Sequence, residues 1–360
     1  MNRIYFYINI ILIFCILYYV FKKNIMYMSN TDVKQVSIGK YHRGTNTIED
    51  SVIFPTIDIK PDMSCLESLR MAGSIHKMIR RDMHQILKPG LDLFDLSTFI
   101  NRKIRYYTND IGVNGGIGFP PILSMSNIIA HYSPYKKMIL GYNDNLKIDF
   151  GVHVNGWIVD SAFTIHFNPD FDVLSIATKD AIDNALKVVG IDTPIDDISS
   201  TINEIVESYE MMYRGSLHQL KVIDGVSGHN IKQYNIHGGL TIPNKPSYNT
   251  QRMAAGVYAI EPFVSIIDSS YYEGNEQNNY RIKPQYIKEC NQLYERFNNL
   301  IFSDSHLLYY NINIDYYKKN NMIDIYPALY GHKDDLSCQY EHTVYLDESL
   351  KEVISRSYDY

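Results

Sequence analysis

The sequence predicts an α+β fold made of two similar halves, with a functional site between them. A strand hairpin centred on Asn155-Gly156 lies near the middle of the chain, and amphipathic helices precede and follow it. In each half a short turn separates two helical patterns. Residues 88–92 (Lys-Pro-Gly-Leu-Asp) form the first turn and residues 190–192 (Gly-Ile-Asp) form the second. This echo indicates a duplicated α/β unit with pseudo-two-fold symmetry.

The composition is that of a globular chain without a nucleic-acid surface. Its 360 residues suffice for one large or two ordinary domains. The formal net charge is −6 with both signs interspersed, whereas a nucleic-acid surface would show a basic stripe or cluster. The four cysteines have neither metal-ligand nor disulfide-framework spacing, so we expect a reducing compartment.

The first segment, residues 1–28, contains an uncharged, apolar run from Ile4 to Phe21. The run is at the short end for a membrane-spanning helix and longer than most signal-peptide cores. We expect a membrane anchor; the alternative is a mis-assigned start, with translation beginning at Met26 or Met28. Similar positive charge flanks both ends, so the orientation of an anchor cannot be predicted.

Residues 29–60 are expected to form a linker, and residues 61–360 the main domain. Pro61 opens a helical pattern that stops at the turn of residues 88–92, and a second helix is predicted from about Leu93 to Tyr107. A glycine-rich loop, Gly112 to Gly118, follows. It lacks the Gly-Lys-Ser/Thr ending of a phosphate loop, so its glycines are expected to serve turns.

The second half of the chain begins after the central hairpin. Two more amphipathic helices are predicted, from Val173 to Val189 and from Ile195 to Met212. A helical insert is expected at about residues 283–322. Strands are predicted near residues 219–224, 257–265 and 338–346.

The hairpin itself brings two acidic side chains together. If Asn155 and Gly156 form the two-residue turn, Asp149 pairs with Ala162 and shares a face of the ladder with Asp160, at a Cα separation of about 7–8 Å. Two ionised carboxylates in an apolar hairpin would repel one another and lose hydration without a counter-charge. A divalent metal ion would supply that charge; the alternative is a pair of solvated carboxylates on an exposed sheet face.

Three further candidate ligands follow in strand or turn contexts: His229, Glu261 and Glu341. Taken singly, a glycine-flanked histidine is usually a loop residue and a strand glutamate often faces water. Together with the two aspartates they make an oxygen-rich set of four carboxylates and one imidazole. Such a set suits paired Mn, Fe, Co or Zn ions rather than one structural zinc.

Several segments resemble the methionine aminopeptidases in order and approximate spacing, from about Pro61 to Tyr360. Residues 233–239 (Gln-Tyr-Asn-Ile-His-Gly-Gly) and the helical insert resemble the type 2 branch of these metallopeptidases. The segments that carry the resemblance are residues 119–120 (Phe-Pro), 130–134 (Ala-His-Tyr-Ser-Pro), 147–151 (Lys-Ile-Asp-Phe-Gly), 158–164 (Ile-Val-Asp-Ser-Ala-Phe-Thr), 228–231 (Gly-His-Asn-Ile), 259–263 (Ala-Ile-Glu-Pro-Phe), 340–343 (Tyr-Glu-His-Thr) and 357–360 (Ser-Tyr-Asp-Tyr).

The resemblance implies the pita-bread fold, with two divalent metal ions between pseudo-symmetric halves. Asp149 would chelate the first metal ion. Asp160 and Glu341 would bridge both ions, and His229 and Glu261 would complete the second. The ions would be Co, Mn, Fe or Zn.

The implied activity is removal of the N-terminal methionine from nascent proteins with a small second residue. In this family a hydroxide that bridges the metals attacks the first peptide bond. Glu261 would accept and return the water proton, and His131 and His237 would contact the substrate. The side chains expected at the methionine pocket are Phe119, Ile236, His237 and Tyr326.

Two other functions remain open at this point: a non-catalytic binding protein on the same fold, and a relative that cleaves Xaa-Pro bonds. A pocket histidine of many type 2 enzymes is replaced here, and Asn279 is the candidate replacement. Nascent chains as substrates would place the protein near the ribosome, with the main domain facing the cytosol. The charged extension of many type 2 relatives is absent, however. We expect a monomer.

Overall fold

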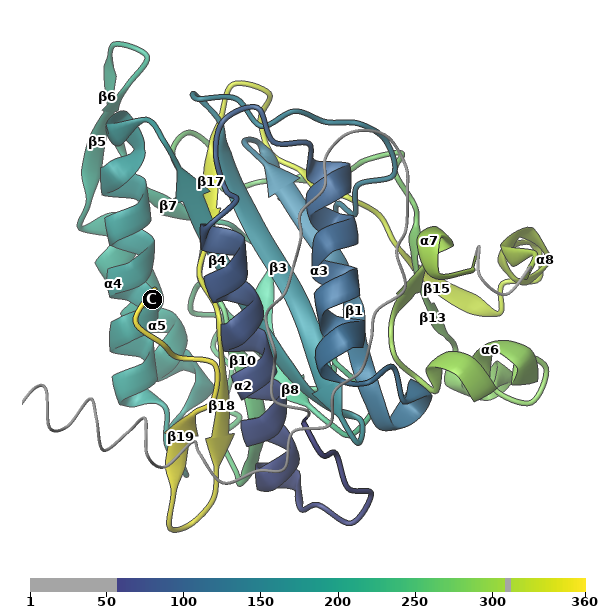
Figure 1. Cartoon of the computed structure of the whole chain (residues 1–360). Coiled ribbons are helices and arrows are strands. Elements are labelled where there is room, and N and C mark those ends of the chain that lie inside the picture. Colours follow the sequence, from purple (N-terminus) through teal and green to yellow (C-terminus); the bar gives the residue numbers. More distant parts are fainter. Residues whose placement is uncertain (1–56, 308–311) are drawn as a thin grey trace, which may run out of the picture. The chain divides into compact units, whose positions relative to one another are not determined.

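Strands β3 (Asn145–Val154) and β4 (Trp157–His166) form the predicted hairpin at the centre of the fold (Figure 1). The computed structural model describes residues 57–307 and 312–360, and Ile59–Tyr360 form one unit. The turn residues Asn155 and Gly156 have φ values of 50° and 78°, and the register pairs Val154 with Trp157 and Asp149 with Ala162. The predicted turn and register are therefore confirmed.

The apolar run at residues 4–21 and most of the expected linker lie outside the described residues. Within residues 57–307 and 312–360, no helix combines the length and the apolar character needed to cross a membrane.

Helices α2 (Cys65–His84) and α3 (Leu93–Tyr107) cover one face of the sheet β1-β3-β4 (Figure 1). The first was expected to open at Pro61, but it begins after Ser64, whose side chain and that of Glu67 form a reciprocal capping box. The second has the predicted bounds, because the Asp92 side chain caps its first turn.

The glycine-rich segment is not a loop, as was expected from its composition. Only Gly112–Asn114 form a 3-10 turn (η1), and the following residues belong to strand β1 (Gly115–Met125), which pairs with β3. A Cβ on Gly118 would lie 2.8 Å from the Ile158 side chain. This glycine therefore permits a close approach between strands rather than a turn.

The second half repeats the helical pair with α4 (Asp172–Val188), which follows a 3-10 turn η2 (Pro169–Phe171), and α5 (Ile195–Glu207). The expected extension of the last helix to Met212 is wrong. Residues 210–213 form strand β5 (Glu210–Tyr213), which pairs with β6 (Ser216–Gln219). The turn between them uses Arg214 and Gly215, both at positive φ.

Two further sheets surround the region where the candidate residues lie. One has five strands in the order β19-β18-β10-β8-β9, and the other has three in the order β17-β11-β7. Their bounds are β7 (Lys221–Val222), β8 (Ser227–Ile231), β9 (Thr241–Pro243), β10 (Gly256–Ile260), β11 (Phe263–Ser265), β17 (Ser337–Gln339), β18 (His342–Leu346) and β19 (Lys351–Val353).

The strands expected at 257–265 and 338–346 are each broken in the middle. The first passes from β10 in one sheet to β11 in the other across Glu261-Pro262, and the second passes from β17 to β18 across Tyr340-Glu341. Because β10 pairs with β18 and β11 with β17, the two crossings lie side by side. Both candidate glutamates therefore stand where the chain changes sheets.

The expected helical insert contains a small sheet as well as helices. Strand β13 (Asn279–Ile282) pairs with β14 (Phe302–Ser303) and β15 (Ile323–Tyr326), and buried side chains of this region form a core cluster of their own. The helical parts are η3 (Pro284–Tyr286), α6 (Asn291–Phe297), α7 (Asp304–Leu307) and α8 (Ile314–Lys319). Another three-stranded sheet joins β2 (Ile128–Ala130), β16 (Leu329–Tyr330) and β12 (Tyr272–Glu273).

The last residues of the sequence pack behind the central hairpin. The Arg80 guanidinium, which is fully buried, donates to both carboxylate oxygens of Asp359 over 2.8 and 2.9 Å. It also lies over the Tyr360 ring at 4.4 Å. The Tyr360 hydroxyl is 2.6 Å from Ser161 Oγ, which donates to the Glu341 carbonyl oxygen over 2.7 Å. Helix α2 is thus tied to the segments that carry two of the candidate ligands.

Candidate metal centre

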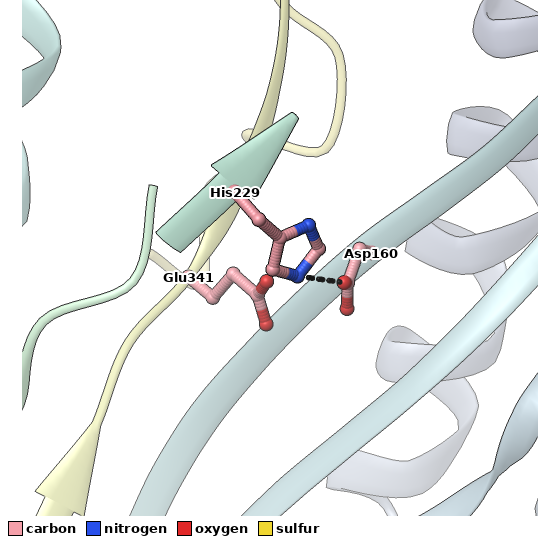
Figure 2. Close-up of side chains that lie close together, drawn as sticks. All are labelled: Asp160, His229 and Glu341. Carbon is pink, nitrogen blue, oxygen red and sulfur yellow. Dashed lines mark ion pairs between the residues drawn. The ribbon is translucent and has the colours of Figure 1, made fainter. Parts of the chain in front are cut away.

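Three candidate ligands from distant parts of the chain point toward one another (Figure 2). They are Asp160 on β4, His229 on β8 and Glu341 at the crossing between β17 and β18. His229 Nε2 lies 3.5 Å from Asp160 Oδ2, and one donor atom from each of the three lies within 4.8 Å of the others. The spacing is suited to a shared cation.

Glu261 and Asp149 complete the set. His229 Nε2 lies 3.4 Å from Glu261 Oε1, while the Gln339 amide nitrogen is 3.4 Å from the other carboxylate oxygen of Glu261. Asp149 lines the same cavity as Asp160, His229 and Glu261. The structure therefore brings all five residues predicted as metal ligands into one region.

Burial keeps these carboxyl groups from ionising freely. Asp160 is 4% exposed and Glu341 is 1% exposed. Burial raises the pKa of Asp149 to about 7. Burial and the neighbouring Asp149 carboxylate raise the pKa of Asp160 well above its ordinary value. Burial and the nearby carboxylates, foremost that of Asp160, raise the pKa of Glu341 in the same direction. Glu261 is shifted in the same direction for the same reasons. Among the residues that the structure describes, the charges that act on Asp160, Glu261 and Glu341 are those of other acids of the same cluster.

Some oxygen atoms in this cluster are also without hydrogen-bond partners. Within the part of the chain that the structure describes, Asp149 Oδ1 and both carboxylate oxygens of Glu341 are buried and accept no hydrogen bond. An unpaired buried carboxylate oxygen is costly, and a divalent cation would satisfy it. Burial lowers the pKa of His229 to about 4, so its imidazole is neutral near pH 7 and can act as a ligand. The residues therefore fit divalent metal ions with oxygen-rich coordination.

A cavity of about 500 Å³ opens next to this cluster. The residues expected to bind the substrate, Phe119, His131, Ile236, His237 and Tyr326, all line it, and Asn279 does too. Glu341 is not on the cavity wall. The sequence did not indicate several other lining side chains, among them Val226, Leu240, Tyr271 and Glu273.

The two candidate substrate-contacting histidines flank one tyrosine. The ring centroids of His131 and His237 each lie 5.9 Å from that of Tyr326, and His237 packs edge-to-face on His229 at 4.6 Å. Burial lowers the pKa of both His131 and His237, and the nearby His229 and His131 lower that of His237 further. Both imidazoles are therefore neutral near pH 7, and each presents one N–H group.

Two residues that hold the ligands were not singled out in the sequence. Gln339 contacts Glu261, and the Thr343 hydroxyl is hydrogen-bonded to the Asp160 backbone. They stand two residues before and two residues after Glu341. Strand alternation does not indicate them, because the chain changes sheets between Gln339 and Thr343.

The sequence model of metallopeptidase family M24 matches residues 67–348 of the chain. Methionine aminopeptidase 2-2 of Emericella nidulans is 35% identical over 342 residues, which cover 88% of this chain and 75% of the relative. Methionine aminopeptidase 2-1 of Chaetomium globosum is 37% identical over 327 residues, which cover 83% of this chain and 74% of the relative.

Among solved structures, methionine aminopeptidase from Thermotoga maritima superimposes with a TM-score of 0.59 at 18% identity, covering 83% of this chain and all of that one. At that identity the likeness concerns the fold, and it confirms the expected pita-bread architecture. The family match also implies that the cluster of acids and imidazole holds divalent metal. The chain therefore belongs to metallopeptidase family M24 and, within that family, to the type 2 methionine aminopeptidases.

Proposed function

We propose that this protein removes the N-terminal methionine from polypeptides whose second residue is small, with two divalent metal ions bound by Asp149, Asp160, His229, Glu261 and Glu341. The observation that supports it most is the convergence of these side chains beside an apolar-walled cavity. Three carboxylate oxygens of the cluster are buried without a hydrogen-bond partner in the described part of the chain. A cation-binding role accounts for them.

In this proposal Asp149, Asp160, His229, Glu261 and Glu341 would together hold the metal ions. When bound, the metal pair supplies a water of lowered pKa as nucleophile and polarises the carbonyl of the scissile peptide. The other tasks, which are binding, orientation and proton transfer, belong to side chains of the chain itself.

The methionine side chain is expected to fill the cavity between Phe119, Ile236 and Tyr326, all of which line it. A flexible thioether adapts well to such a wall of aromatic and aliphatic groups. The chain beyond the methionine must then pass the cavity mouth, which favours a small second side chain such as Gly, Ala, Ser, Thr or Val.

Proton transfer is assigned to Glu261. Its carboxylate accepts a proton from the attacking water and delivers it to the nitrogen of the leaving peptide, so the proton is conserved over the cycle. Burial and the neighbouring carboxylates raise the pKa of Glu261 above its ordinary value, which is the direction that favours proton acceptance. The neutral imidazole of His237 can donate an N–H to the oxygen that gains charge during the attack, while the His131 ring, which is hydrogen-bonded to the Pro327 backbone, would contact the substrate through its other ring nitrogen.

The test is release of methionine from the peptide Met-Ala-Ser by purified protein. Metal-stripped protein should be inactive and should recover activity on addition of Mn²⁺ or Co²⁺. Cleavage of an Xaa-Pro peptide in preference to Met-Ala-Ser would assign the chain to a different activity of the same fold. Absence of turnover by the metal-loaded protein on either peptide would contradict the proposal and favour a non-catalytic binding role. Since nascent polypeptides are the substrates, we expect the enzyme to act in the cytosol.

A further inference from the structure

We propose that Asn279 is a positioning residue that fixes the His131 side chain in the cavity by holding the His131 backbone. The inference rests on the proposed function, because it concerns a histidine assigned to the same site. Asn279 lies on β13, far from His131 in the sequence, and both residues line the cavity.

The backbone of His131 has an unusual conformation. Its φ is 63°, in the left-handed region that non-glycine residues seldom occupy. The neighbours on both sides are fixed: Ala130 pairs with Leu329 at the end of β2, and the Tyr132 carbonyl accepts the Leu123 amide over 2.7 Å. Such a conformation persists only when its surroundings over-determine it.

The side-chain amide of Asn279 supplies that support. Its Nδ2 donates to the His131 carbonyl over 3.0 Å, and its Oδ1 accepts from the Ser133 hydroxyl over 3.0 Å. A carbonyl can only accept, so the nitrogen of the amide must face His131. Asn279 is 1% exposed, and the neighbouring Asn278 donates to the Ser133 carbonyl over 2.8 Å. The His131 and Ser133 carbonyls are thus held from the first residue of β13 and from the residue before it.

The imidazole is held from the same small sheet. Asn279 pairs with Tyr326 across β13 and β15, and the Tyr326 ring packs edge-to-face on the His131 ring. One strand therefore holds the backbone of His131 and its neighbour contacts the ring. Without the amide, the carbonyl would be unpaired in a buried place and the backbone could relax toward a commoner φ. The ring would then leave the position in which it faces the substrate.

The experiment compares Asn279→Leu, which keeps the volume but removes the donor, with wild type. We expect kcat on Met-Ala-Ser to fall by about 10- to 100-fold with little change in KM, since a misplaced catalytic group weakens the transition state more than substrate binding. In a His131→Ala background the same substitution should have little further effect. The His131 Cε1–Hε1 resonance of metal-free, histidine-labelled protein should also move or broaden. That readout does not depend on turnover.

Asn145→Leu is the matched control. Asn145 is also 1% exposed and donates to a backbone carbonyl, that of Ser337, over 2.7 Å, but it does not line the cavity. It should leave the His131 resonance and kcat unchanged. If Asn279→Leu does not fold, Ser133→Ala provides a milder test with the same expected signs.

An unchanged resonance, or a loss of kcat that persists in full in the His131→Ala background, would overturn the positioning role. Inactive wild-type protein would instead count against the proposed function. The resonance would still decide whether Asn279 holds the ring.

Discussion

The Thr343 hydroxyl is hydrogen-bonded to both backbone groups of Asp160: it donates to the carbonyl over 2.6 Å and accepts from the amide over 2.8 Å. Thr343 lies on β18, whereas Asp160 lies on β4 of a different sheet. One hydroxyl therefore satisfies two buried backbone groups of Asp160, a proposed metal ligand. It also ties Asp160 to β18, the strand that directly follows Glu341, which is a second proposed ligand. Support of this kind sets the orientation of a ligand before the metal arrives.

Replacing Thr343 by valine should weaken metal binding. Valine preserves the branched shape but leaves the Asp160 amide and carbonyl unpaired, so we expect Mn²⁺ affinity to fall by about 10- to 100-fold. Isothermal titration of metal-free protein measures it. Thr343→Ser, which keeps the hydroxyl, should bind nearly as well as wild type. Equal affinity of the valine and serine variants would contradict this role.

The proposed ligands themselves should be indispensable for turnover but not for folding. We expect Asp160→Asn or His229→Ala to lower kcat/KM by orders of magnitude, with near-native circular dichroism. Glu261→Gln should still bind at least one metal ion yet lose about 10²- to 10⁴-fold in kcat, the usual contribution of a general base. Peptide turnover and metal content measure the two effects. Wild-type-like activity in the aspartate or histidine variant would sink the mechanism.

Metal binding should become tighter as pH rises. Burial holds the pKa of Asp149 at about 7 and raises that of Asp160 well above its ordinary value, so the metal-free site still carries protons near neutrality. The metal must displace those protons, and its affinity is lost as pH falls. His229, with a pKa lowered to about 4 by burial, is already neutral and releases none. The folding stability of the metal-free protein should instead decrease as pH rises. These acids bind more protons in the folded than in the unfolded state, so their ionisation costs stability.

Calorimetric titration with Mn²⁺ between about pH 6 and pH 8, in buffers of different ionisation enthalpy, measures the released protons. An affinity that stays constant across this range, with no proton release, would show that the carboxyls are fully ionised before metal binds.

A methyl group on Gly151 should disturb the substrate cavity. An added Cβ would collide with ring atoms of Phe119, which lines the cavity next to Asp149. We expect Gly151→Ala to raise KM for Met-Ala-Ser more than it lowers kcat, because the Phe119 ring, which we propose contacts methionine, must move. Gly190→Ala is the control, since the atom nearest to its added Cβ, Thr193 Oγ1, would lie 3.4 Å away. Equal steady-state kinetics for the two variants would refute the collision.

Removal of Asp359 should destabilise the protein far more than loss of a surface ion pair. Asp359→Ala leaves the buried Arg80 guanidinium without its carboxylate, a change that costs about 3 kcal/mol or more. Asp183→Ala breaks the exposed pair with Arg356 and should cost less than about 1 kcal/mol. Urea unfolding of metal-free protein gives both values. Similar costs would mean that Arg80 finds other compensation.

The central hairpin could be predicted to the residue because its signal is local. Asn155 and Gly156 both adopt the positive φ that these two residue types tolerate best, and strand alternation then sets the partner of Asp149. The hairpin of β5 and β6 was not predicted, because it has no such local signal. Its turn lacks an Asn-Gly signature, and Met211 and Met212 continue a helical spacing past the true end of α5.

The candidate ligands could be named from the sequence, but their supports could not. The breaks at Glu261 and Glu341 depend on which distant strands pair with each side of the crossing, and no local pattern encodes that pairing. Nor does composition reveal that the buried amide of Asn279 faces the carbonyl of His131. Long-range contacts of this kind are decided by tertiary packing, which overrides local preference.

The two sheet crossings also affect how easily the two sheets separate from one another. The seam between the five-stranded and three-stranded sheets passes through Glu261 and Glu341, whose buried carboxyls must either keep a proton or repel one another when no cation lies between them. Bound metal would therefore also hold the two sheets together, in addition to its part in the reaction. Hydrogen exchange in β10, β11, β17 and β18 should therefore slow together on metal loading, as one cooperative unit, while the exchange of α3 stays as it was.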